Sequence, residues 1–63
     1  MMNLEKYMEE TFLEEMRPSN FFDESGKELK IDQNDYENYA VIKVEKINTE
    51  YVIEQNITVR HIG

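Results

Sequence analysis

The sequence predicts a small α+β domain in which one N-terminal helix packs on an antiparallel sheet, a meander of three or four strands. Three observations predict this class. Apolar residues recur at three- and four-residue spacing near the N-terminus. Two segments near the C-terminus are rich in β-branched residues. The chain contains six Ile, three Leu, three Phe and four Tyr, a composition too apolar for a disordered acidic segment. Its 63 residues are expected to form a single domain (1–63).

The helix is expected over residues 4–16. Asn3 is a suitable N-cap, because its side-chain oxygen can accept hydrogen bonds from the first free amides of a helix. Arg17 suits the carboxyl end of the helix dipole, and Pro18 cannot continue the hydrogen-bond ladder. The apolar stripe between these signals consists of Leu4, Tyr7, Met8, Thr11, Phe12 and Met16.

Two hairpins are expected after the helix. Short strands at 20–23 and 27–31 flank a turn in which Gly26 can take the positive φ that a tight turn needs. A polar connector at 32–38, with room for one helical turn, leads to long strands at 39–47 and 51–62. Asn48 and Thr49 form the turn between the long strands.

The register of the long hairpin follows from its apolar residues. Val44 opposite Ile53 and Ala40 opposite Ile57 would bring the apolar sets of both strands to one face. This register leaves His61 and Ile62 unpaired, as a strand end to which another chain could add. The other face would be mixed and would include Val41, Ile47 and Val52, which favours a partner or a second copy covering part of it.

The charge of the chain is uneven. The first 37 residues contain eleven Asp or Glu and four Lys or Arg, whereas residues 38–63 contain three of each sign, so the formal net charge of −7 lies in the front part. Such a charge repels nucleic acids and anionic membranes. The expected partner is therefore a basic protein surface, without direct nucleic-acid or membrane binding.

The candidate partner-binding residues are helix glutamates and residues of the 23–37 segment. Carboxylates repeated along a helix can imitate backbone phosphates and compete for Lys and Arg side chains. Exposed tyrosines are enriched among interface anchors, although the tyrosine of this segment could instead fold back onto the sheet. An ordinary solvated helix face is the alternative for the glutamates. The candidates are Glu5, Glu9, Glu10, Glu14, Asp23, Glu24, Asp32, Asp35, Tyr36 and Glu37.

No catalytic residue, metal site or cofactor is expected. There is no cysteine, and Ser19 and Ser25 lie in no nucleophile motif. His61 is expected on the core side of the last strand, as a hydrogen-bonded structural residue. The oxygen-rich segment from Asp32 to Glu37 departs from the calcium-loop pattern at its fifth and sixth positions.

The predicted function is that of a non-enzymatic protein-binding module, a small acidic inhibitor or regulator that docks on a basic protein surface. Scarce alanine with abundant Asn, Ile and Lys is typical of AT-rich genomes and favours a phage or other mobile element. The alternative is a structural homo-oligomer that pairs through a strand edge or the outer sheet face. An enzyme is the third hypothesis. Without a signal-peptide pattern or a long apolar run, a cytoplasmic location is expected.

Overall fold

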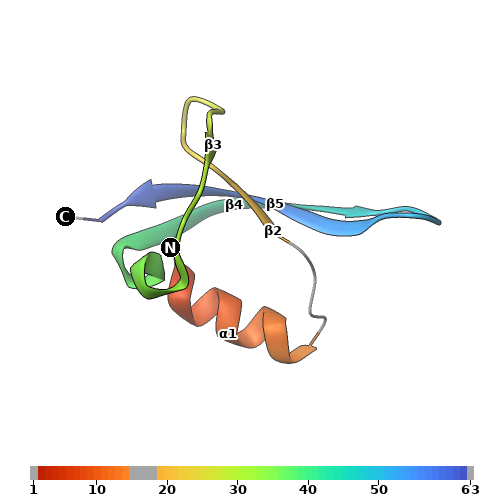
Figure 1. Ribbon diagram of the computed structural model, residues 1–63, viewed down its shortest axis with the longest axis horizontal. Coiled ribbons are helices and arrows are strands. Elements are labelled where there is room, and N and C mark those ends of the chain that lie inside the picture. The colour runs from red at the N-terminus through yellow and green to blue at the C-terminus, as the bar shows by residue number, and fades with distance from the viewer. Residues whose placement is uncertain (1, 15–18, 63) are drawn as a thin grey trace.

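The computed structural model describes residues 2–14 and 19–62, and the side chains of residues 11–14 lie outside this description. A two-residue strand, β1 (Met2–Asn3), leads directly into the helix α1 (Leu4–Glu14). The helix and the later 3-10 helix lie on the same side of the sheet (Figure 1). The remaining elements are β2 (Ser19–Phe22), β3 (Glu28–Leu29), the 3-10 helix η1 (Gln33–Asn38), β4 (Tyr39–Asn48) and β5 (Ile53–His61).

The five strands of the described residues form one sheet in the order β1-β4-β5-β2-β3. The α+β class is therefore confirmed, and both expected hairpins, β2–β3 and β4–β5, are antiparallel. The sheet is mixed, because β2 lies parallel to β5, with Phe21 opposite Ile57. A simple meander would have placed the strands in chain order. The parallel pairing instead brings Phe21 and Ile57 together in the core.

Asn3 starts the helix as predicted. Its Oδ1 accepts a hydrogen bond from the Glu5 amide at 2.8 Å, and α1 begins at Leu4. The same side chain uses its Nδ2 to donate to the Glu37 carbonyl at 3.0 Å, so one residue caps α1 and joins it to η1. The predicted helix end at Met16 lies outside the described residues.

The hydrophobic core lies between the sheet and the two helices. Its fully buried members come from three elements, α1, β2 and β5. Half-buried apolar side chains from α1, β3, η1 and β4 pack around them. The buried cluster consists of Leu4, Phe21, Ile57 and Val59.

The predicted register of the long hairpin is wrong. Val44 pairs with Ile57 instead of Ile53, and Ala40 pairs with Arg60 instead of Ile57. The register shifts between Val41 and Lys43, where one extra residue, Ile42, forms a β-bulge. Simple alternation had placed Val41 on the outer face. The bulge changes the phase, so that Val41 and Val44 both pack on the core while Ile42 is exposed.

The predicted unpaired end of the last strand is also wrong. Tyr39 pairs with His61, and the Ile62 amide donates to the Asn38 carbonyl at 2.7 Å. His61 is exposed instead of lying in the core, because the strand has run past the residues that α1 covers. Its ring packs edge-on against Tyr39, with 5.1 Å between ring centroids.

The end of the β4–β5 hairpin projects beyond the rest of the sheet. β1 pairs only with Ala40 and Val41 of β4, and the pairing of β2 with β5 begins at Gln55. Residues 47–54 therefore form a two-stranded extension, the tongue, which reaches away from α1 at one end of the molecule (Figure 1). The tongue contributes to the long dimension of a molecule measuring 39 × 26 × 20 Å.

Candidate functional site

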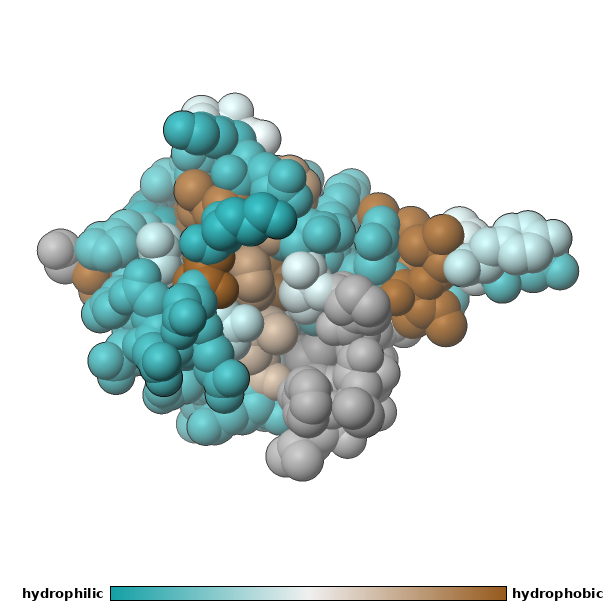
Figure 2. All heavy atoms as spheres, viewed as in Figure 1, coloured by the Kyte–Doolittle hydropathy of each residue, from teal (hydrophilic) through white to brown (hydrophobic). Residues whose placement is uncertain are grey.

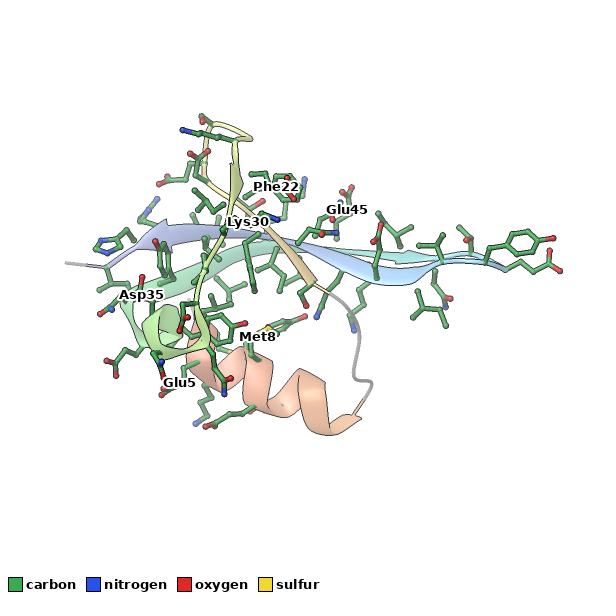
Figure 3. All side chains as sticks on the ribbon, in the orientation of Figure 1. Glu5, Met8, Phe22, Lys30, Asp35 and Glu45 are labelled. Atoms are coloured by element: carbon green, nitrogen blue, oxygen red, sulfur yellow. The ribbon has the colours of Figure 1, made fainter. Side chains whose placement is uncertain are left out.

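Six of the predicted carboxylates lie on two elements that contact each other, α1 and η1 with its capping residue. Figure 3 shows two of them, Glu5 and Asp35, at the same end of the molecule. Among residues 4–14 and 32–38, Lys6 is the one Lys or Arg. The α1–η1 acidic surface, as this set is named below, consists of Glu5, Glu9, Glu10, Asp32, Asp35 and Glu37.

The glutamates of this surface are open to solvent. Glu5, Glu9, Glu10 and Glu37 are all exposed. Within residues 2–14 and 19–62, none of these four forms an ion pair. Within the described residues, no ion pair compensates their negative charge, which is available to an external cation.

The two aspartates of the surface also have local structural roles. The Asp32 side chain caps η1 by accepting from the Asn34 amide at 2.8 Å, and Asp35 accepts from the side-chain amide of Asn38. These hydrogen bonds account for the oxygen-rich composition of the segment. In the part of the chain that the structure describes, no cluster of three or more His, Asp or Glu side chains could hold a metal ion.

Tyr36 takes the folded-back position that was the alternative to an exposed contact residue. It is half-buried and packs against the core, with its ring centroid 5.7 Å from that of Phe21. Burial, with a smaller effect of the Asp32 charge, raises the pKa of the Tyr36 phenol. The contact anchors η1 on the sheet, so Tyr36 positions the acidic surface from beneath.

Asp23 and Glu24 are not brought to the α1–η1 acidic surface. They lie in the β2–β3 turn, on the side of the sheet opposite α1 (Figure 1). Glu24 forms an ion pair with Arg60, at 3.2 Å between Oε2 and Nη2. Nine of the ten predicted residues therefore divide between two places, and the side chain of the tenth, Glu14, lies outside the described part.

Asp23 instead holds the turn together. Its Oδ1 accepts from the amides of Ser25 and Lys27 and from the Ser25 hydroxyl. These bonds, the hydroxyl of Ser25 first, lower the pKa of the Asp23 carboxyl, because each stabilises its charged form. Gly26 follows with φ of 91°, as the sequence predicts for a tight turn.

Sequence reasoning missed a buried polar bridge under the helix. Gln55 is fully buried, and its Oε1 accepts from the Tyr7 hydroxyl at 2.7 Å. Its Nε2 donates to the Ser19 hydroxyl at 2.9 Å, so the amide connects α1, β5 and β2. The alternation of side chains along β5 could have predicted this burial, because Gln55 shares the face of the strand that carries Ile53 and Ile57. A polar side chain on a buried face is expected to form hydrogen bonds.

An open groove of about 410 Å³ runs between β2 and the segment that follows the turn. Residues 19–21 and 28–32 line it. Its apolar lining comes from Phe21, Leu29 and Ile31, and its charged lining from Glu28, Lys30 and Asp32. No histidine or cysteine is among the described residues that line the groove.

Comparisons with protein-family models, with curated proteins and with solved structures gave no match to the chain. Within the described residues, α1 is too short and too polar to span a bilayer. The evidence for function is therefore the geometry and charge of the molecule itself.

Proposed function

We propose that the protein is a non-enzymatic protein-binding module, a small acidic inhibitor or regulator that docks on a basic protein surface. The observation that carries the proposal is the α1–η1 acidic surface, where contact between two elements gathers carboxylates from separate parts of the chain. Its four glutamates are exposed and form no ion pair within the described residues. Complementary charge of this kind accelerates association and selects basic partners.

The charge density supports a partner surface of the type that binds nucleic acid. The segment from Glu5 to Glu10 spans about 8 Å along the helix axis, since an α-helix rises about 1.5 Å per residue. Double-stranded DNA carries one charge per about 1.7 Å, which is four or five charges over the same length. Glu5, Glu9 and Glu10 place three carboxylates within this length, and η1 with its capping residue adds Asp32, Asp35 and Glu37 beside the helix. The surface can therefore occupy a short groove lined with Lys and Arg.

A pair of double charge reversals tests the proposal. Glu9→Lys/Glu10→Lys changes the acidic surface, and Glu28→Lys/Glu45→Lys changes two exposed glutamates elsewhere. Each reversal adds two charges, so both variants move the formal net charge from −7 to −3. Basic proteins captured from the source cells by the wild type are purified, and their affinities for all three proteins are measured at several salt concentrations.

The proposal expects Glu9→Lys/Glu10→Lys to weaken binding at least about tenfold, an electrostatic change that salt would reduce. The control variant should bind within about threefold of the wild type. Equal losses in both variants would show that only net charge matters. Unchanged affinity of Glu9→Lys/Glu10→Lys would refute docking through the acidic surface.

The second candidate function is a structural homo-oligomer, and one observation favours it. Among the described strands, none pairs with the outer edge of β4 between Lys43 and Asn48. The bulge at Ile42 and the exposed Lys43 weigh against it, because bulges and lysines protect edges from pairing. Sedimentation separates the two candidates: a dimer at micromolar concentration that salt leaves intact supports the oligomer, and a monomer supports the binding module.

A further inference from the structure

The end of the tongue exposes three consecutive apolar side chains. Tyr51 is 89% exposed, Val52 41% and Ile53 56%. Figure 2 shows hydrophobic atoms gathered on the tongue, between the body of the molecule and the paler tip. None of the three belongs to the core or packs against it. These side chains are therefore outside the described core, and their exposure leaves apolar surface in water.

The backbone beneath Tyr51 is held by its own turn. The Thr49 amide donates to the Val52 carbonyl at 2.8 Å. The Thr49 hydroxyl oxygen accepts from the amides of Val52, at 3.0 Å, and Tyr51, at 3.3 Å. Because the turn satisfies these groups internally, a partner that binds Tyr51 has little backbone to order.

The chemistry around the tip selects the kind of partner. Within residues 47–54 there is no Lys, Arg or His. Glu50 is exposed beside the tip, whereas Glu54 is half-buried and accepts a hydrogen bond from the Asn20 side chain at 3.4 Å. An exposed carboxylate beside an apolar tip complements cations around an apolar site, and it disfavours a phosphate-rich surface.

Size argues against a second copy as the occupant. The three side chains offer a few hundred Å², given the roughly 150–250 Å² of a buried aromatic residue. A stable pairing of two flat surfaces needs about 800 Å² from each partner. A concave site on a partner protein would surround the tip and bury more of its surface than a flat surface could.

We propose that the tongue is an anchor whose tip, centred on Tyr51, inserts into an apolar pocket rimmed by Lys or Arg on a partner protein. The inference rests on the proposed role of the chain as a binding module. It does not depend on the α1–η1 acidic surface, and it places a second contact at a different end of the molecule. Tyrosine suits this role, since a rigid ring with a polar tip loses little entropy on burial.

Site-specific photo-cross-linking tests the anchor. The full chain carries benzoylphenylalanine in place of Tyr51, or in place of Ile42 as a control, because Ile42 is also exposed but lies at the β4 bulge, outside the tongue and outside the α1–η1 acidic surface. Both proteins are irradiated in an extract of the source cells. The expected result is a protein adduct specific to position 51, with the cross-linked peptide next to Lys or Arg. Adducts no more abundant at position 51 than at position 42 would overturn the inference.

The cross-linked protein is then purified and titrated with variants of the chain. Tyr51→Ala and Ile53→Ala should each weaken binding about tenfold or more, while Ile42→Ala, which removes the same atoms as Ile53→Ala, should have less than a twofold effect. If Glu9→Lys/Glu10→Lys loses binding and Tyr51→Ala does not, the anchor is overturned and docking through the acidic surface is supported. If Tyr51→Ala loses binding and Glu9→Lys/Glu10→Lys does not, the anchor is supported and docking through the acidic surface is overturned. Binding of the tip to zwitterionic lipid vesicles that Tyr51→Ala abolishes would also overturn it, because the occupant would then be a bilayer.

Discussion

The hydrogen bond between Tyr7 and Gln55 should be the strongest polar contribution to the attachment of α1, and a double-mutant cycle can measure it. Gln55 has no exposed surface, and its carbonyl oxygen lies 2.7 Å from the Tyr7 hydroxyl. Tyr7→Phe removes the donor and keeps the ring. Gln55→Leu removes the acceptor and keeps a side chain of similar size. Together they isolate one bond between the helix and β5.

The expected magnitudes follow from burial. Tyr7→Phe leaves a buried amide oxygen without its donor, which costs about 1–3 kcal/mol. Gln55→Leu also loses the bond to Ser19 and should destabilise the fold by about 1–2 kcal/mol, since an apolar side chain offsets part of the loss. In the double variant neither member of the Tyr7–Gln55 bond remains. We therefore expect it to be about 1 kcal/mol more stable than the sum of the single changes implies.

Urea denaturation followed by circular dichroism gives the free energy of unfolding for each variant. A chain of this length has about 3–9 kcal/mol of stability, so the expected changes are a large fraction of it. Tyr51→Phe is the matched control, because it removes a hydroxyl from a tyrosine that is 89% exposed, and it should change stability by less than about 0.5 kcal/mol. Additivity of Tyr7→Phe and Gln55→Leu within about 0.5 kcal/mol would refute the reasoning.

Three further predictions concern the core and the β2–β3 turn. Leu4→Ala removes a fully buried side chain and should lower the free energy of unfolding by about 2–5 kcal/mol in the same denaturation assay, so an effect below about 1 kcal/mol would contradict the observed core. Gly26→Ala should lower the free energy of unfolding by about 1 kcal/mol through its φ of 91° alone, because a Cβ there meets no atom within 4 Å. Gly26→Asn should lower the free energy of unfolding by less, since Asn adopts positive φ more readily than Ala. Equal effects of the two substitutions would argue against backbone strain. The Asp23 carboxyl has a pKa lowered by its hydrogen bonds, so its stabilisation of the turn is present above the ordinary value of 3.8 and is lost as the pH falls through the lower pKa of the folded state. The Lys27 amide resonance should follow this titration below pH 3.8 and should lose it in Asp23→Asn, and a midpoint at or above 3.8 would contradict the bonds seen in the turn.

Local signals predicted the local structure well. Asn3 was recognised as the helix cap and Gly26 as the turn residue with positive φ, and both act over a few neighbouring residues. The candidate site was predicted less completely. Glu5, Glu9 and Glu10 are exposed as expected, but Asp23 and Glu24 lie at a separate turn. The distribution of charge along a chain does not determine which segments fold to the same side of a sheet.

Amino-acid order alone determined where α1 begins, where the chain turns, that two long segments form a hairpin, and that the front part of the molecule is acidic. Those features depend on residues close in sequence, whose dihedral preferences and capping groups act without the rest of the fold. The tertiary structure alone decided that β2 joins β5, that the bulge at Ile42 turns Val41 inward, and that Gln55 is buried under Tyr7. Each of these outcomes brings together segments far apart in the chain, and only the packing of a shared core selects one among several sterically allowed pairings.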